Sequence, residues 1–393
     1  MVATRLRSKL LAVIVRSKLL AVVGRSWPVL EWMRWRCEPY GVRVRKTADG
    51  VEMRREDRSM LLSPKHVFFA EEICNSFDAY SHALSSMELE GIISVDFASS
   101  PESFDLVRRC LQLGVKIEHR ANEICLHKGE RVMILSSRHF IYAWDMTQKF
   151  DLYFSPLVPE EREGSLVLDY SRPGRLQTYR KSGLQFEMAS FPEEEESIEE
   201  YFRWYRPKPG DTVFDVGAHC GVSTYHLSTL VGPNGRVISF EPDPINYSIL
   251  QRNIERHGLS NVTAQNIALA GTAGRLQFNS EGTIGSALVS QLFRDSVGSI
   301  IEVDALTLSD AFEKWGEPAF CKIDIEGAEL EVVANSGDLL RKCQTNFAFD
   351  TNHPKENGEM TNGEIEAMFR SYGYEVASEA NPLLTTWARR RVS

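Results

Sequence analysis

Residues 212–221 have the sequence TVFDVGAHCG, and residues 236–244 have the sequence RVISFEPDP. In the first stretch a short apolar run ends at Asp215, and Gly217 and Gly221 then lead into the helix-like run GVSTYHLSTL. This order predicts a strand, a tight loop and a helix. Gly217 has no Cβ, so a ligand can approach the loop backbone closely, and the first amides of the helix after Gly221 are unpaired. The stretch therefore predicts a ligand-binding loop.

The second stretch predicts the other half of the same site. Its apolar run, residues 237–240, ends in Glu241, about twenty residues beyond the loop, where an acidic side chain can accept hydrogen bonds from both hydroxyls of a ribose. The two strand ends together predict a cofactor site. The residues expected to form it are Asp215, Gly217, Ala218, Gly221 and Glu241.

Asp215 bears on which cofactor would bind. Dinucleotide enzymes usually carry three glycines and rest a pyrophosphate on the helix N-terminus, where a carboxylate would repel it. The same carboxylate could orient the ammonium group of an amino-acid cofactor, directly or through water. The loop therefore favours S-adenosylmethionine over NAD, and the alternative is a tight turn in some other α/β protein.

Composition limits the class of protein. The chain has 393 residues, 43% of them apolar and 25% charged, which describes a soluble globular protein of two or three domains. A net charge of −9 argues against nucleic acid as a partner. The seven cysteines are scattered and form no CxxC pair, so we predict no disulfide framework, no metal site and a cytoplasmic location.

The first 48 residues are basic and contain a nine-residue repeat, RSKLLAVIV at 7–15 and RSKLLAVVG at 16–24. In a helix, nine residues make two and a half turns, so the basic residues of the two copies would lie on opposite sides. The apolar runs are also too short for a membrane span. We expect residues 1–48 to be a flexible segment, with a peripheral membrane anchor as the alternative.

A longer repeat fills the next region. When the chain is displaced by 73 positions, RSMLLSPKHVFFAEEICNSFDAYSHAL from Arg58 aligns with RVMILSSRHFIYAWDMTQKFDLYFSPL from Arg131. Each copy predicts a hairpin through a charged turn (REDR or KGER), a helix and a strand ending in VDF or LDY. We therefore expect an α+β accessory region of two duplicated units, 49–117 and 118–190. The aligned His66 and His139 could be paired ligands, but helix-start residues beside aromatic side chains are the favoured interpretation.

From residue 191 the pattern predicts a different domain. The acidic run PEEEESIEEYF at 192–202 is expected to be the solvated start of a helix. Alternating strands and helices then predict a parallel sheet with ligands at the carboxyl ends of its strands. The strands are expected at 212–217, 236–241, 262–269, 319–325 and 346–351, and the helices at 221–231, 244–257, 307–315 and 362–372.

A third chemical stretch is FCKIDIEGAELEV at 320–332. Its strand ends at Asp324, and Glu326 and Glu329 follow in the turn and the first helical residues. These carboxylates lie at the carboxyl end of a parallel strand, beside the expected crevice. Burying several carboxylates there is costly unless they bind something, which favours a functional role over a solvated loop.

Together, DVGAHCG, VISFEPDP and KIDIEGAE resemble the FkbM-type family of S-adenosylmethionine-dependent methyltransferases. The resemblance extends from about residue 194 to the C-terminus and implies a Rossmann-like class I methyltransferase domain at 191–393. It implies methyl transfer to an oxygen, commonly a hydroxyl of a sugar or secondary metabolite. By position, Asp215, Gly217 and Gly221 resemble the family's cofactor loop. Glu241 resembles its ribose acid, and Asp324 with Glu326 its acceptor-side carboxylates.

One departure concerns the next strand end, where this chain has FDTNHP, with Asp350 and His353, in place of the family's frequent Glu. An alcohol acceptor loses its proton as the new bond forms, so a general base is needed. His353 and Asp324 are the candidates. Our hypothesis is that His353 is the base and Asp324 orients the acceptor, and the expected catalytic residues are Asp324, Glu326 and His353.

Two functions of other classes stay open at this point. The fold could serve a nicotinamide-dependent oxidoreductase. The chain could also be a non-catalytic S-adenosylmethionine-binding module whose duplicated region recruits a partner. Measuring which cofactor binds would separate the first alternative from a methyltransferase, and measuring turnover would separate the second.

Overall fold

The computed structural model describes residues 27–47, 51–56, 58–62, 69–78, 80, 101–120, 122–193, 195–288, 298–353, 355, 359–380 and 383–390. The chain forms two compact units. The N-terminal unit is Met1–Leu152 with Pro159–Leu168, and the C-terminal unit is Tyr153–Val158 with Asp169–Ser393. The nine-residue basic repeat lies outside the described residues, as does His66. None of the helices in the described ranges is long and apolar enough to cross a membrane.

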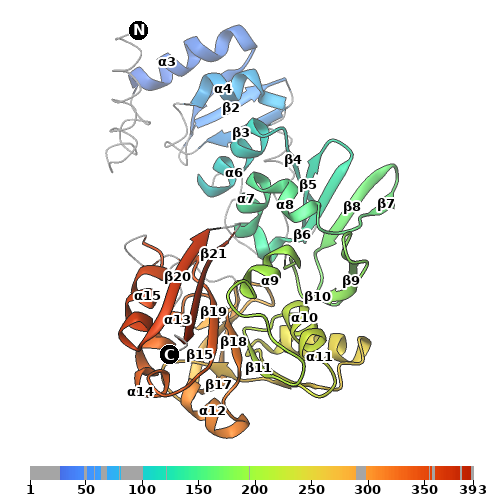
Figure 1. Cartoon of the computed structure of the whole chain (residues 1–393). Coiled ribbons are helices and arrows are strands. Elements are labelled where there is room, and N and C mark those ends of the chain that lie inside the picture. Colours follow the sequence, from blue (N-terminus) through green and yellow to red (C-terminus); the bar gives the residue numbers. More distant parts are fainter. Residues whose placement is uncertain are drawn as a thin grey trace. The chain divides into compact units, whose positions relative to one another are not determined.

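The N-terminal unit contains two antiparallel hairpins, each followed by helix (Figure 1). Its first sheet has the order β1-β2-β3, and its second has the order β4-β5-β6-β8-β7. The first elements are α3 (Trp27–Cys37), η1 (Glu38–Tyr40), β1 (Arg43–Lys46), β2 (Val51–Arg55), β3 (Arg58–Leu62) and α4 (Ala70–Asn75). The later elements are α6 (Pro101–Gln112), β4 (Lys116–Arg120), β5 (Glu123–Lys128), β6 (Arg131–Ser136), η4 (Ser137–His139), α7 (Phe140–Gln148), α8 (Phe150–Phe154), β7 (Glu160–Arg162) and β8 (Ser165–Tyr170).

The start of the chain differs from the sequence-based expectation. Residues 27–47 form α3, η1 and β1, and the side chains of Leu30, Met33 and Cys37 are buried. The prediction of a flexible segment up to residue 48 is therefore wrong for residues 27–47. The prediction rested on the basic charge of residues 1–48 and on the short repeat at 7–24. The apolar side chains of residues 27–47 nevertheless pack into the unit, and this packing orders their backbone.

The two halves of the N-terminal unit have the same order of described elements: a helix, three antiparallel strands and a helix. His139 immediately precedes α7 and makes an edge contact with the ring of Tyr142, at 6.1 Å between centroids. This confirms the helix-start interpretation for His139. The strand expected at the end of the first copy, with the sequence VDF, lies outside the described residues, and the duplication itself stays a prediction.

The C-terminal unit is built on a seven-stranded sheet with the order β13-β12-β11-β18-β19-β21-β20 (Figure 1). The first five strands are parallel, and β21 is antiparallel to both β19 and β20. This is the Rossmann-like arrangement in which the strand order reverses beside the first strand, β11, and leaves a crevice at the carboxyl ends. The strands are β11 (Thr212–Val216), β12 (Arg236–Phe240), β13 (Val262–Gln265), β18 (Phe320–Ile323), β19 (Asn346–Asp350), β20 (Tyr374–Ala380) and β21 (Leu384–Arg390).

Helices cover both faces of this sheet. Phe214 and Ile238 belong to a buried cluster with Phe312, Val332 and Phe369, which come from α12, α13 and α15. Because successive strand residues point to opposite faces, the Asp215 side chain lies on the other face, where it contacts α10. The helices are α9 (Glu195–Tyr201), α10 (Val222–Val231), α11 (Pro244–Arg256), α12 (Leu308–Trp315), α13 (Glu329–Asn335), α14 (Gly337–Leu340) and α15 (Asn362–Ser371).

A smaller sheet, with the order β14-β17-β15-β16, was not predicted. The expected strand at 262–269 divides into β13 in the main sheet and β14 in the smaller one. Between them the Asn266 amide donates to the backbone oxygens of Glu241 and Pro242, so the chain leaves the main sheet there. The strands are β14 (Ala268–Leu269), β15 (Gly274–Ser280), β16 (Ala287–Leu288) and β17 (Ser299–Leu306).

A hairpin of β9 (Arg175–Thr178) and β10 (Gln185–Met188) also belongs to the C-terminal unit. The Glu187 carboxylate accepts hydrogen bonds from Arg252 and Arg256 of α11. Asn253, on the same helix, pairs with both backbone groups of Glu187 and donates to the backbone oxygen of Cys220 in the loop after β11. The hairpin is thus connected to that loop, and the unit begins before the expected boundary at residue 191.

We predict that Asn253→Ala destabilises the C-terminal unit by more than about 2 kcal/mol, since it removes hydrogen bonds from buried backbone groups. Asn253 is 2% exposed. Denaturant unfolding followed by tryptophan fluorescence measures the change. Gln251→Ala, on the exposed face of the same helix, should change stability by less than about 0.5 kcal/mol. Equal effects of the two substitutions would contradict a structural role for Asn253.

Candidate functional site

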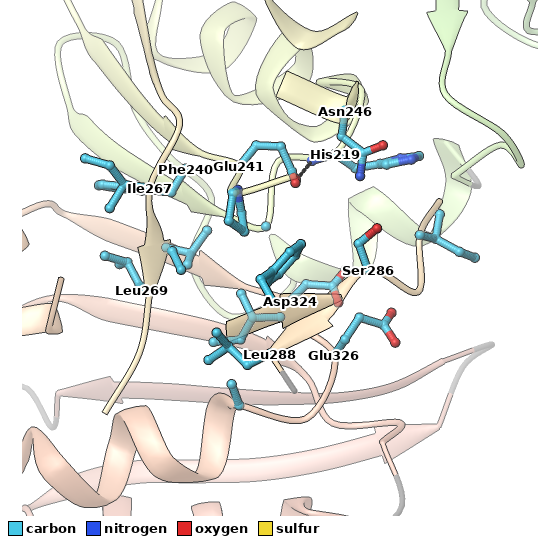
Figure 2. A pocket seen from close by; sticks show the side chains of 18 of the residues that line it. His219, Phe240, Glu241, Asn246, Ile267, Leu269, Ser286, Leu288, Asp324 and Glu326 are labelled. Carbon is cyan, nitrogen blue, oxygen red and sulfur yellow. Dashed lines mark hydrogen bonds between the residues drawn. The ribbon is translucent and has the colours of Figure 1, made fainter. Parts of the chain in front are cut away.

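A pocket of about 690 Å³, including its open mouth, lies at the carboxyl ends of β11, β12 and β18 (Figure 2). Glu241 and His219 lie on one side of it, and Asp324 and Glu326 lie on the other. The lining residues are Glu193, Val216, Gly217, His219, Phe240, Glu241, Pro242, Asn246, Ile267, Ala268, Leu269, Phe278, Thr283, Ile284, Ser286, Leu288, Asp324, Ile325, Glu326 and Ala328.

The loop after β11 approaches the end of β18 very closely. Gly217 has a φ of +78°, and a Cβ at this position would lie 1.7 Å from the backbone oxygen of Asp324. Gly221 has a φ of +90°, and its Cβ would lie 2.5 Å from Leu250. Both positions therefore require glycine, for backbone conformation and for space. Of these two glycines, Gly217 lines the pocket. Gly221 does not line it and instead packs against Leu250 of α11.

Asp215 lies beneath this loop, and its side chain is fully buried. Its Oδ2 accepts hydrogen bonds from the hydroxyls of Ser223, at 2.8 Å, and Thr224, at 2.6 Å. Its Oδ1 lies 3.6 Å from the Lys322 ammonium. Burial raises the pKa of Asp215, and Lys322 acts in the opposite direction. Neither Asp215 nor Ala218 is among the residues that line the pocket, and both are fully buried.

Glu241 faces the pocket from the end of β12 and is 5% exposed. Its Oε2 accepts from the backbone amide of His219 at 2.8 Å, and its Oε1 accepts from that of Asp243 at 2.9 Å. Burial and the nearby Asp243 carboxylate raise the pKa of Glu241 to about 7. Each carboxylate oxygen retains a second lone pair, so the group can accept further hydrogen bonds from a ligand.

Asp243 holds the rim of the pocket in place. Its Oδ1 caps α11 through the amides of Ile245 and Asn246. Its Oδ2 accepts from the Gly282 amide and the Ser286 hydroxyl in the segment that follows β15. One buried carboxylate thus joins the end of β12 to this segment of the smaller sheet. The side chains of Phe278 and Leu288 complete the apolar wall there.

Glu193 and His219 are site residues that sequence reasoning missed. The His219 Nδ1 lies 2.9 Å from Glu193 Oε1. Although burial lowers the pKa of His219, the neighbouring Cys220 and Glu193 raise it well above its usual value. Glu193 lies just before α9 and lines the pocket, and Glu195 is 9% exposed, so the acidic run is not uniformly solvated as predicted. The available signal was the imidazole in DVGAHCG, because a polar side chain needs a hydrogen-bond partner when it is buried.

Across the pocket, Asp324 contacts both a phenol and an ammonium. Its Oδ2 accepts from the Tyr201 hydroxyl at 3.3 Å and lies 3.5 Å from Lys322 Nζ. Lys322 also donates to the Gly217 backbone oxygen at 2.8 Å. Burial lowers the pKa of Lys322, but Asp324 and Asp215 outweigh burial and raise it. Lys322 therefore stays charged and connects the ends of β11 and β18.

Beyond Asp324 lies a cluster formed by Glu326, Glu329 and His353. His353 Nε2 is 3.6 Å from Glu326 Oε1, and its Nδ1 is 3.4 Å from Glu329 Oε1. Burial lowers the pKa of His353, but Glu329 and Glu326 raise it well above its usual value. Nearby Asp350 is 7% exposed, and burial and Asp324 raise its pKa to about 7. The expected residues Asp324, Glu326 and His353 thus come together, and Glu329 and Asp350 join them.

Metal-ligating atoms also come together here. One atom each from Asp324, Glu329 and His353 lies within 4.8 Å of the others. The sequence predicted no metal site, because these residues come from separate strand ends and have no characteristic spacing. The remaining pocket surface is apolar near Phe240 and Leu269 and acidic near Asp324 and Glu326. Such a site can bind an apolar ring beside polar or cationic groups.

Comparison with known proteins identifies this domain. Residues 215–376 match the family model described as the methyltransferase FkbM domain. The chain is 28% identical over 206 residues to 31-O-demethyl-FK506 methyltransferase FkbM of Streptomyces tacrolimicus, a match that covers 45% of this chain and 77% of that protein. It is 24% identical over 198 residues to methyltransferase sdnD of Sordaria araneosa, covering 42% and 74%. These matches support an FkbM methyltransferase domain at residues 215–376.

Two solved structures that match this chain have lower sequence identity than these relatives, and their TM-scores are low. Methyltransferase FkbM of Methylobacillus flagellatus KT is 14% identical with a TM-score of 0.35, covering 81% of this chain and 60% of that one. An S-adenosylmethionine-dependent O-methyltransferase of Thermotoga maritima is 14% identical with a TM-score of 0.30, covering 57% and 80%. The strand order of the seven-stranded sheet, and not these overlaps, defines the fold.

We predict that Gly217→Ala unfolds the C-terminal unit or destabilises it by more than about 4 kcal/mol, since left-handed strain adds to a collision with Asp324. Thermal and denaturant unfolding measure the loss. Gly232→Ala is the matched control, because Gly232 also has a positive φ, +65°, but has nothing within 4 Å of the added Cβ. Because Gly232 has a φ of +65° and a ψ of −175°, a conformation that favours glycine, the control variant should still lose about 1–3 kcal/mol of stability. Similar costs for both variants would show that the close approach is unimportant.

Proposed function

We propose that this chain is an O-methyltransferase that transfers a methyl group from S-adenosylmethionine to a hydroxyl oxygen of a small molecule, a sugar or a secondary metabolite. The observation that carries the proposal is that one pocket has the Glu241 carboxylate on one side and Asp324 with Glu326 on the other. A group-transfer enzyme must hold the cofactor and the acceptor next to each other, and the two sides of this pocket would allow that.

The residues present fit the cofactor. Glu241 is a buried carboxylate that can accept hydrogen bonds from ribose hydroxyls. Gly217 has no side chain, so a ligand can contact its backbone directly. Phe240 and Ile267 provide apolar contacts for a planar base. We assign Glu241 to the ribose and Gly217 to the amino-acid part. Asp215, Ala218 and Gly221 are assigned to holding the loop in shape.

The protein's own part in the reaction is mainly positioning. When bound, S-adenosylmethionine supplies a methyl group whose bond to sulfur breaks, with the electron pair kept by sulfur, while the acceptor oxygen forms its bond to carbon and loses its proton. Asp324 lines the pocket and His353 does not, which supports Asp324 over His353 as the group that takes the acceptor proton. Glu326, also in the pocket wall, would orient the acceptor, with His353 behind it.

We further propose that the N-terminal unit is an accessory region of two copies of one α+β motif, with the cofactor site wholly in the C-terminal unit. The shared order of helix, three strands and helix supports the duplication. The observation that all lining residues of the pocket come from positions 193–328 supports the separate cofactor site.

The test is incubation of the full chain with methyl-labelled S-adenosylmethionine and a fractionated metabolite extract. Labelled product and an equal amount of S-adenosylhomocysteine are expected, and mass spectrometry of the product identifies the methylated oxygen. Glu326→Gln, which leaves the contacts of Lys322 intact, should lower turnover while leaving cofactor affinity within a few fold. Cofactor binding with no transfer to any fraction would favour the non-catalytic binding module. Binding of NAD in place of S-adenosylmethionine would favour the oxidoreductase.

We predict that Glu241→Ala weakens S-adenosylmethionine binding by about 1.5–3 kcal/mol, because hydrogen bonds to a charged group contribute about that much. Isothermal calorimetry measures the change. Glu241→Gln should weaken binding less, since the amide keeps one acceptor oxygen, and Glu255→Ala on the exposed face of α11 is the neutral control. Unaltered affinity in both Glu241 variants would remove this residue from the cofactor site.

We also predict that cofactor affinity depends on pH through Glu241. Its pKa of about 7 lies above the ordinary 4.5, so the free site is partly protonated near neutral pH. Ribose hydroxyls donate to the ionised form, so binding releases a proton, and affinity should rise from about pH 6 to about pH 8 and then level off. Folding stability should change in the opposite direction. Between pH 4.5 and about 7 the folded state holds a proton on Glu241 that the unfolded state has lost, so stability falls as pH rises through this range. In Glu241→Gln the rise in affinity should be absent, and a wild-type slope in that variant would refute the assignment.

A further inference from the structure

We infer that Asp324, Glu329 and His353 form a binding site for a divalent metal ion, which holds the acceptor oxygen at the acidic side of the pocket. Asp324 ends β18, Glu329 begins α13 and His353 follows β19. Their ligand atoms lie within 4.8 Å of one another. Three ligands that each lie about 2.2 Å from one ion are about 3–4 Å apart, so these side chains would have to approach one another by up to about 1–2 Å.

Glu329 provides the independent observation. Its side chain has 0% exposure. Its Oε1 accepts from the Ile325 amide at 2.8 Å, but its Oε2 has no hydrogen-bond partner within the described part of the chain. A buried carboxylate oxygen without a partner costs several kcal/mol unless a cation or donor compensates it. The unpaired oxygen and the nearby imidazole are what a bound cation would use.

The imidazole is already oriented for this role. His353 Nδ1 faces Glu329 at 3.4 Å and makes no hydrogen bond to a described residue, while Nε2 faces Glu326 at 3.6 Å. Histidine ligands of metals usually donate the other ring N–H to a carboxylate, which fixes the tautomer and orientation. We therefore assign Nδ1 of His353 as the ligand atom and Glu326 as the carboxylate that positions the ring.

The local charge also favours a cation. Among the described residues at these strand ends, Lys322 is a cation already occupied by Asp215, Asp324 and the Gly217 oxygen, and His353 must lose its extra proton before it can bind a metal. The carboxylates outnumber them: Asp215, Asp324, Glu326, Glu329 and Asp350. A divalent ion would offset this excess. Two carboxylates and one imidazole are a ligand set that suits Mn²⁺ better than Mg²⁺, which prefers oxygen ligands only.

The role of the ion rests on the proposed function. Asp324 and Glu326 line the pocket, so an ion held by Asp324 would lie at the pocket wall and bind the oxygen of a hydroxyl acceptor. An ion there would lower the pKa of that hydroxyl, and with Asp324 bound to the ion the proton would pass to Asp350 or water as the oxygen takes up the methyl group. Binding of the ion itself needs neither cofactor nor acceptor.

The experiment is titration of the chelator-treated full chain with Mn²⁺, in the absence of cofactor, followed by the electron paramagnetic resonance signal of free Mn²⁺. We expect one ion per chain, with nitrogen coupling to the bound ion in pulsed spectra. Glu329→Gln and His353→Ala should each weaken binding by more than 100-fold, and His353→Ala should abolish the nitrogen coupling. Glu326→Gln should weaken binding about 10-fold. Glu331→Gln, on the same helix but outside the cluster, should bind like the wild type.

The outcomes are decisive for each part separately. Circular dichroism and cofactor calorimetry confirm that each variant is folded. No Mn²⁺ binding by the wild type, or unchanged binding in both Glu329→Gln and His353→Ala, refutes the metal site whether or not the chain methylates anything. Full methyl transfer in the presence of chelator refutes the role of the ion in holding the acceptor and leaves the proposed function intact. Failure of methyl transfer with tight Mn²⁺ binding refutes the proposed function alone.

Discussion

The Lys322 ammonium lies between the carboxylates of Asp215 and Asp324 and donates to the backbone oxygen of Gly217. Its side chain is 3% exposed, so removing either carboxylate would leave a buried charge with less compensation. The contact joins β11 and β18, the adjacent parallel strands at which the order of the sheet reverses. The crevice of a Rossmann-like sheet opens at this point, and its shape depends on the two strand ends keeping their spacing.

Each side of the pocket depends on that spacing in a different way. On the cofactor side, Gly217 passes so close to Asp324 that no side chain fits between them. The loop then continues to His219, whose backbone amide fixes one oxygen of Glu241. On the acidic side, Asp324 receives the Tyr201 hydroxyl in addition to Lys322. Since all of these groups are buried or nearly so, a polar group that lost its partner would destabilise the unit as well as the site.

The two walls also differ in how their charges are compensated. Glu241 accepts from two backbone amides, which are fixed by the fold and carry no titrating proton. The cluster around His353 is compensated by another side chain, and Glu329 keeps one oxygen without a partner in the described residues. The first wall can therefore accept hydrogen bonds from a neutral hydroxyl donor, whereas the second fits the cation that we propose. This difference is the physical basis for assigning cofactor and acceptor to opposite sides of one pocket.

The sequence by itself determined the five parallel strands of the main sheet and the positions of its chemical side chains, but not the antiparallel strands β20 and β21. Apolar runs bounded by glycines located the parallel strands, and Glu241 and Asp324 were predicted at strand ends because a local pattern records where a strand stops. It also predicted a tight loop between the strand that begins at residue 212 and the helix after Gly221, since Gly217 and Gly221 have few other uses so close together.

Only the tertiary structure decided which side chains meet. It placed Asp215 beneath the loop, because burial beside Ser223 and Thr224 depends on the packing of α10 on the sheet. It paired Glu193 with His219 and Glu329 with His353, and it divided residues 262–269 between two sheets. It also showed residues 27–47 as helix and strand where composition predicted flexibility. These contacts join positions far apart in the chain, and periodicity reports only the face on which a residue lies, not the residue opposite it.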